Sequence, residues 1–203
     1  MDTSPVLAAA DAHETDAHET DAHETDASER WLRFAILVAL ISAAAALRLA
    51  PHWDNFTPLG AIALFGGAAF RSRGASVLLP LAVVFLTDLL IGVHVLMPFV
   101  YACLLFNVWL GSCLKKHLRP VPLAGATLLG AVVFFVTTNF ACWVVYEGDS
   151  LAGLARYYVM GLPYFASSLA GDATYGLLLF GGWALAERYV PALRPATERT
   201  AVC

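Results

Sequence analysis

The stretch RLAPHWDNFTPLGAIALFGG, residues 48–67, joins a polar segment to an apolar run rich in glycine and alanine. Its first half places a cation, an imidazole, a carboxylate and an amide around Pro51 and Pro58. Long apolar runs lie on both sides of it. A simple turn between two membrane helices would need fewer functional groups. We therefore predict that residues 48–58 form a lid and wall of a binding pocket at the membrane edge.

The chain as a whole carries too little charge for a soluble protein. Of its 203 residues, 59% are hydrophobic and 14% are charged, whereas soluble domains contain roughly 25% charged residues. Its mean hydropathy is +0.68. This composition predicts an all-α membrane protein with one membrane domain. No basic patch interleaved with aromatic residues indicates binding to nucleic acid.

The N-terminal region has a different composition. The pentapeptide DAHET occurs three times from Asp11 and is followed by DASER. We predict a disordered, acidic, low-complexity tail over residues 1–29, a transmembrane domain over 30–190 and a short cytoplasmic tail over 191–203. The tail histidines are interpreted as a solvated repeat, and the four cysteines show no CxxC spacing. No metal site and no cofactor are predicted.

The apolar runs predict six transmembrane helices. Their ranges are 31–50, 57–71, 75–93, 96–114, 121–145 and 163–187, and residues 147–163 are predicted to form a short interfacial helix. With six spans, ten of the twelve Lys and Arg residues fall on the side of both termini. Only Arg48 and Arg156 fall on the other side. Because cytoplasmic loops are enriched in Lys and Arg, this predicts a multi-pass protein of the inner (plasma) membrane with both termini cytoplasmic.

Polar residues lie in the outer half of several predicted spans. A charge at the bilayer centre costs about 2.5–3.5 kcal/mol on insertion scales, so such residues face the bundle interior or water. We expect Arg48, Asp88 and Asp172 to approach one another in a pocket open to the outside and roofed by loops 51–58, 92–97 and 146–162. The candidate substrate-binding residues are Arg48, His52, Trp53, Asn55, Phe56, Asp88, His94, Asn107, Asn139, Trp143 and Asp172.

A structural interpretation of the same residues stays open. Arg48 and an acid could form an ion pair that only holds helices together. The aromatic residues could belong to the belt that membrane proteins place at the interface. Small residues at Ala35, Ala39 and Ala43 recur at helical spacing and predict either packing inside the bundle or docking of a separate membrane subunit.

Motifs for enzymatic chemistry are missing from the sequence. It contains no GxxxxGK[ST] phosphate loop, no Gly-x-Ser-x-Gly elbow and no HExxH zinc motif. We therefore expect that the protein is not an enzyme.

Three stretches carry a resemblance to a known family: PHWDNFTPLGAIALFGGAAF, LPLAVVFLTDLLIG and LPYFASSLAGDATYGLLLFGGWALAER. They resemble the domain-of-unknown-function family DUF6580 of bacterial membrane proteins, described as candidate transport proteins, over residues 31–194. More distantly, the chain is similar to the substrate-binding S-components of energy-coupling-factor (ECF) vitamin transporters. This second resemblance implies a six-helix bundle with both termini inside and an outward pocket capped by loops. It also implies that Ala35, Ala39 and Ala43 meet a transmembrane coupling subunit that works with ATPases.

Three functions follow as hypotheses. The first is a binding and transport component for a vitamin-like small molecule, energised by partner subunits. The second is a stand-alone carrier driven by protons, with Asp88 or Asp172 as the relay. The third is a membrane scaffold without transport.

Overall fold

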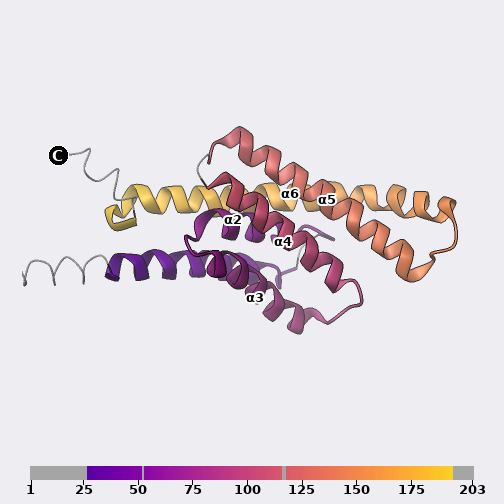
Figure 1. The fold of residues 1–203 in the computed structure, drawn as a ribbon, viewed down its shortest axis with the longest axis horizontal. Helices are drawn as coiled ribbons and strands as arrows, with labels where there is room; N and C mark the ends of the chain where they lie inside the picture. Colours follow the sequence, from indigo (N-terminus) through magenta and orange to yellow (C-terminus); the bar gives the residue numbers. More distant parts are fainter. Residues whose placement is uncertain (1–26, 52, 116–117, 194–203) are drawn as a thin grey trace, which may run out of the picture. The chain divides into compact units, whose positions relative to one another are not determined.

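The computed structural model describes residues 27–51, 53–115 and 118–193, and regular structure in these ranges is entirely helical. The elements are an N-terminal helix (Ala27–Leu47), α2 (Leu59–Ala69), α3 (Arg73–Ile91), α4 (Met97–Leu114), α5 (Pro120–Tyr146), α6 (Leu151–Tyr189) and a short 3-10 helix (Pro191–Leu193) (Figure 1). The prediction of an all-α chain is therefore confirmed, and the described residues form six α-helices. The DAHET repeats, and the predicted C-terminal tail from residue 194 onward, lie outside the described residues.

The chain divides into two compact units. Among the described residues, one combines residues 27–36 with 186–193, and the other is Leu37–Leu185. In the first unit, Arg33 donates to the carbonyl oxygen of Leu193 at 2.8 Å and pairs with Glu187 at 3.4 Å. The second unit holds every described residue that the sequence placed in the pocket.

Helix α2 forms the centre of the second unit, between longer helices (Figure 1). All residues from Ala61 to Ala68 are buried, and Phe65 packs edge-on against Phe180 of α6 with ring centroids 5.1 Å apart. A helix that is apolar on every side is stable only when it is surrounded. Its 11 residues span about 16 Å, about half the thickness of the bilayer core. The predicted second span is thus a short buried helix.

Glycines allow the backbone of α2 to contact the backbone of α4 directly. A Cβ atom at Gly67 would lie 2.1 Å from the carbonyl oxygen of Val108, and one at Gly111 would lie 2.0 Å from that of Leu64. Only residues without a side chain fit at these two positions. The glycine-rich composition of residues 59–69 is therefore a packing requirement.

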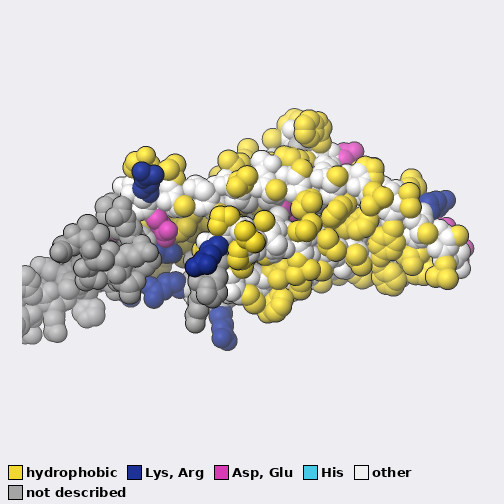
Figure 2. Space-filling model, turned by 90° about the horizontal axis from the view of Figure 1, so that it is seen from above, with side chains coloured by type: hydrophobic (Ala, Val, Ile, Leu, Met, Phe, Trp, Pro, Cys, Tyr) yellow, Lys and Arg dark blue, Asp and Glu magenta, His cyan; other side chains and the backbone are white. Residues whose placement is uncertain are grey.

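The outer surface of the second unit is apolar. Large hydrophobic side chains on α3 and α5 are exposed, among them Leu78, Leu90, Leu128 and Val136, and Figure 2 shows a broad hydrophobic surface. Four helices are long and apolar enough to cross a bilayer: the N-terminal helix, α3, α4 and α5. This combination indicates a membrane protein.

Helix α6 differs from the prediction at its start. It begins at Leu151 and continues through Pro163 for 39 residues. The separate interfacial helix over residues 147–163 is therefore wrong, because those residues from Leu151 onward form the first turns of α6. An internal proline does not end the helix because membrane helices tolerate it.

Candidate functional site

The segment between the N-terminal helix and α2 is held against α6. The hydroxyl of Ser167 donates to the carbonyl oxygen of Asp54 at 2.6 Å. The ring of Phe56 packs against Tyr175, with centroids 5.8 Å apart. A Cβ atom at Gly171 would lie 2.9 Å from the amide nitrogen of Thr57, so α6 approaches this backbone closely. Ser167, Gly171 and Tyr175 recur at four-residue spacing and therefore fix the segment from one face of α6.

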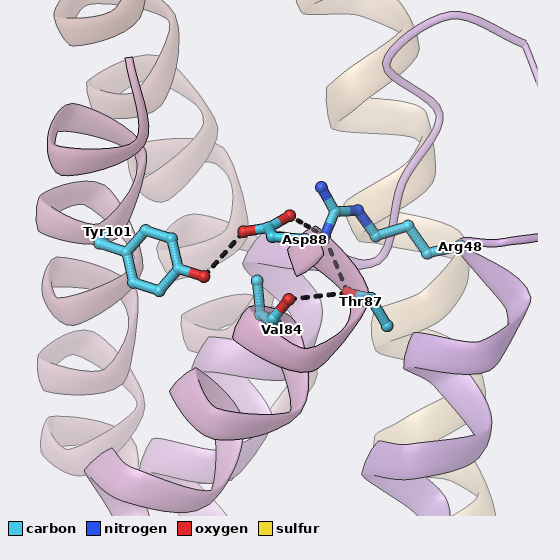
Figure 3. Close-up of polar contacts among 5 residues, drawn as sticks. All are labelled: Arg48, Val84, Thr87, Asp88 and Tyr101. Atoms are coloured by element: carbon cyan, nitrogen blue, oxygen red, sulfur yellow. Dashed lines mark hydrogen bonds and ion pairs between the residues drawn. The ribbon is translucent and has the colours of Figure 1, made fainter. Parts of the chain in front are cut away.

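An ion pair links this segment to α3. Arg48 Nη1 lies 2.5 Å from Asp88 Oδ1, and the exposed fractions of the two side chains are 12% and 4%. Arg48 also donates to the hydroxyl of Thr87 at 2.9 Å, which in turn donates to the carbonyl oxygen of Val84 at 2.8 Å. Figure 3 shows the second carboxylate oxygen of Asp88 accepting from the Tyr101 hydroxyl of α4, at 2.7 Å. Both charges of the pair are thus hydrogen-bonded as well as paired.

Asp172 does not join this pair. Its carboxylate accepts from the amide of Ala61 at 3.0 Å, at the start of α2. The helix N-terminus carries a partial positive charge, which favours a carboxylate at this position. Gly60 makes room for it, because a Cβ atom there would lie 2.3 Å from Asp172 Oδ2. The expectation that Arg48, Asp88 and Asp172 converge is therefore wrong for Asp172, which caps α2.

Asp172→Ala should lower the melting temperature of the protein by several degrees without removing ligand binding. Loss of a helix cap costs about 0.5–2 kcal/mol, and the buried amide of Ala61 would be left without its acceptor. Asp172→Asn keeps one oxygen acceptor and should cost less. Thermal unfolding by circular dichroism, paired with a binding measurement, checks this. A variant with unchanged melting temperature and lost binding would show that Asp172 contacts ligand.

A partly open cavity of about 510 Å³ lies beside the Arg48–Asp88 pair. One side comes from residues 48–59 and from α3, α4 and the loop between them. The other side comes from α5 and α6. The described lining residues are Arg48, Asn55, Thr57, Leu59, Asp88, His94, Leu96, Val100, Ala131, Phe134, Phe135, Thr138, Asn139, Cys142, Tyr157, Met160, Gly161, Tyr164, Phe165 and Ser168. The volume lies in the range of small-molecule sites, about 300–1,000 Å³.

Five of the predicted site residues line this cavity: Arg48, Asn55, Asp88, His94 and Asn139. They come from the segment before α2, from α3, from the loop after α3, and from α5. The structure therefore brings these five residues together around one cavity. Ligand binding by these five residues stays a prediction.

The other described candidates lie elsewhere. Asn107 is 3% exposed and donates to the carbonyl oxygen of Cys103, while Gly130 of α5 packs against its amide. Trp143 donates from its indole nitrogen to the carbonyl oxygen of Ser150, at the turn between α5 and α6.

Trp53, Phe56 and Asp172 are likewise not among the described lining residues. Trp53 is 80% exposed and contacts Phe56, with ring centroids 5.9 Å apart. Phe56 packs on Tyr175, and Asp172 caps α2. His52 lies outside the described residues.

Sequence reasoning missed most of the wall contributed by α5 and α6. The α5 contacts are Ala131, Phe134, Phe135, Thr138, Asn139 and Cys142, and the α6 contacts are Tyr157, Met160, Gly161, Tyr164, Phe165 and Ser168. Both sets follow the spacing of one helix face. A search for such stripes on neighbouring helices could have found them.

Ala35, Ala39 and Ala43 are all exposed. Their use as a docking surface stays a prediction. Among the residues that the structure describes, no group of three His, Cys, Asp or Glu side chains could hold a metal ion.

Comparison with known proteins gives one match. The sequence model of DUF6580, described as a family of unknown function, matches residues 28–193. No curated protein and no solved structure matches the chain.

Proposed function

The chain belongs to the DUF6580 family of unknown function, and we propose that it is the substrate-binding component of a small-molecule transporter in the plasma membrane. The observation that carries the proposal is the cavity of about 510 Å³, lined by aromatic rings and a few convergent polar groups. Small-molecule sites have this composition. A substrate as small as a vitamin-like micronutrient suits the volume.

The distribution of charge supports an outward-facing cavity. Lys115 at the end of α4 donates to Ser76 of α3 at 3.3 Å, so the basic residues of both helices gather at one end. The Arg48–Asp88 pair and the cavity involve the opposite ends of α3 and α4. Because the basic end of a membrane protein is cytoplasmic, both termini are cytoplasmic in this proposal and the cavity opens outward.

The proposed energy source is a partner complex. The three alanines at positions 35, 39 and 43 are exposed on the N-terminal helix. Small exposed residues at this spacing let another membrane helix approach closely. In this proposal they contact a transmembrane coupling subunit that works with ATPases.

A proton-coupled carrier is a second candidate, favoured by two buried acids. Asp88 and Asp172 are 3% and 7% exposed. Acidic side chains inside membrane domains commonly relay protons. Uptake into liposomes that follows an imposed pH gradient, without ATPase subunits, would favour this candidate.

The proposal predicts that a small molecule accompanies the purified protein and occupies the cavity. Thr138→Trp on α5 should exclude it, because Thr138 lines the cavity. Val136→Trp is the matched control, since Val136 lies on the same helix and its side chain is 47% exposed. Native mass spectrometry of the gently purified proteins should show a non-lipid adduct on the wild type and on Val136→Trp, and none on Thr138→Trp.

Two results would contradict the proposed binding of a small molecule in the cavity. If no adduct other than lipid accompanies the wild type, or if Thr138→Trp retains it, the cavity does not hold the substrate.

A further inference from the structure

The cavity beside the Arg48–Asp88 pair has an aromatic wall. Rings from α5 and α6 line it: Phe134, Phe135, Tyr157, Tyr164 and Phe165. Phe135 is fixed by neighbouring rings, with centroids 5.1 Å from Phe165 and 5.7 Å from Tyr158. Aromatic side chains in such an arrangement offer faces and edges to a planar ring system.

Among the described lining residues, the positive charge of Arg48 and the negative charge of Asp88 neutralise each other. Arg48 and Asp88 form an ion pair, and Asp88 uses its second oxygen to accept from Tyr101. An anionic ligand that paired with Arg48 would leave the Asp88 carboxylate without its counter-ion. A cationic ligand that paired with Asp88 would leave the Arg48 guanidinium without its counter-ion. Leaving one buried charge without its partner is strongly unfavourable. The pair therefore disfavours a ligand with net charge of either sign.

Uncharged polar groups around the cavity have unused hydrogen-bonding capacity. Among the described residues, the side chains of Asn55, His94, Tyr157, Tyr164 and Ser168 have no hydrogen-bond partner. The amide nitrogen of Asn139 donates to the carbonyl oxygen of Phe135 at 2.8 Å, which leaves the amide oxygen for another donor. These groups suit a neutral ligand with donors and acceptors on its edge.

The backbone at Asn55 has an unusual conformation for a residue with a side chain. Its φ angle is +59°, in the left-handed region that asparagine tolerates better than most residues. Its carbonyl oxygen accepts from the amide of Thr57 at 3.0 Å, which fixes this turn. The turn thus presents the Asn55 amide at the cavity wall from a fixed backbone.

From these observations we infer that the cavity selects an uncharged, planar heteroaromatic molecule, whose ring stacks on the α5–α6 wall and whose edge hydrogen-bonds to Asn55. This inference rests on the proposed function and adds the class of substrate. The Arg48–Asp88 pair serves as the element that rejects charged analogues. Asn55 is the residue that distinguishes a ligand whose edge forms hydrogen bonds from a ligand whose edge is apolar.

Three probes separate charge from aromaticity. Quinaldamide and quinaldate share a quinoline ring, but the first is neutral and the second is an anion at neutral pH. Cyclohexanecarboxamide is neutral and is neither planar nor aromatic. Equilibrium dialysis of the full chain in lipid nanodiscs measures each Kd, with empty nanodiscs and Thr138→Trp reporting partition into lipid.

We expect quinaldamide to bind at least ten-fold more tightly than either of the other probes. Asn55→Gly should weaken quinaldamide binding at least five-fold with an unchanged melting temperature, because glycine adopts the same φ without strain. Equal or tighter binding of quinaldate would overturn the inference about charge. Unchanged quinaldamide binding to Asn55→Gly would overturn the role of Asn55.

Failure of the inference can be told from failure of the proposed function. If no probe binds, or if cyclohexanecarboxamide binds best, while native mass spectrometry still shows an adduct that Thr138→Trp loses, the substrate belongs to another class. If that adduct is also missing, the proposed function itself fails.

Discussion

Asp88→Ala should lower the free energy of unfolding by about 3–5 kcal/mol, the usual cost of stranding one member of a buried ion pair. The Arg48 side chain is only 12% exposed, so its guanidinium would lose the carboxylate without gaining full hydration. The hydroxyl of Tyr101 would also lose its acceptor. Unfolding in mixed micelles with increasing SDS, followed by circular dichroism, measures the change.

Two further variants make this result specific. Arg48→Gln in the Asp88→Ala background should restore part of the stability, because no charge is then left buried. Glu147→Gln breaks another ion pair, in which Arg156 is 63% exposed, and should cost less than about 1 kcal/mol. A cost for Asp88→Ala no larger than that of Glu147→Gln would contradict the assignment of a buried pair.

Gly67→Ala should destabilise the protein by about 3 kcal/mol or more, at the upper end of the usual cost of overpacking. The new Cβ atom would lie 2.1 Å from the carbonyl oxygen of Val108 and 2.9 Å from its carbonyl carbon. Because these are backbone atoms of α4, no side-chain rotation relieves the clash and one helix must move. The same SDS unfolding measurement detects the loss.

Glycines with open surroundings supply the control. A Cβ atom at Gly125 of α5 or Gly181 of α6 would meet nothing within 4 Å, and both residues are exposed. Alanine at either position should leave stability unchanged or raise it by up to about 1 kcal/mol, because alanine favours helix. If Gly67→Ala behaves like these two controls, α2 and α4 do not pack at backbone distance.

The main features of the fold could be predicted from hydropathy and charge. Continuous apolar runs identify α3, α4 and α5, since a helix satisfies its own backbone hydrogen bonds in lipid. The role of α2 was harder to predict, because its glycines and alanines are apolar enough for residues 57–71 to resemble a short membrane span. The structure shows that α2 is a buried packing helix, because Gly67 of α2 and Gly111 of α4 each contact the backbone of the other helix.

The candidate site was predictable where charge dictates structure. Arg48 and Asp88 had to meet a partner inside an apolar bundle, and they meet each other. For Asp172 the same argument failed, because the Ala61 amide at the start of α2 provides the carboxylate with a partner that is not a cation. Sequence spacing does not reveal which of these two solutions a buried acid adopts.

The three phenylalanines of the aromatic wall were missed for a different reason. Phe134, Phe135 and Phe165 resemble ordinary lipid-facing or core residues in a single sequence, since membrane helices contain such residues on every side. The cavity that these rings line becomes visible only when α5 and α6 lie next to each other in the structure. The family match over residues 28–193 identifies the family and leaves the function of this wall to experiment.

The most direct test of the proposed cavity is an experimental density map of the gently purified wild-type protein in lipid nanodiscs, compared with Thr138→Trp. Our account predicts compact non-protein density between Phe135 and Asn55 in the wild type, separate from lipid chains, and its disappearance in the variant. Density that is absent from the wild type, or that continues into the surrounding lipid in both proteins, would contradict a substrate site at this position.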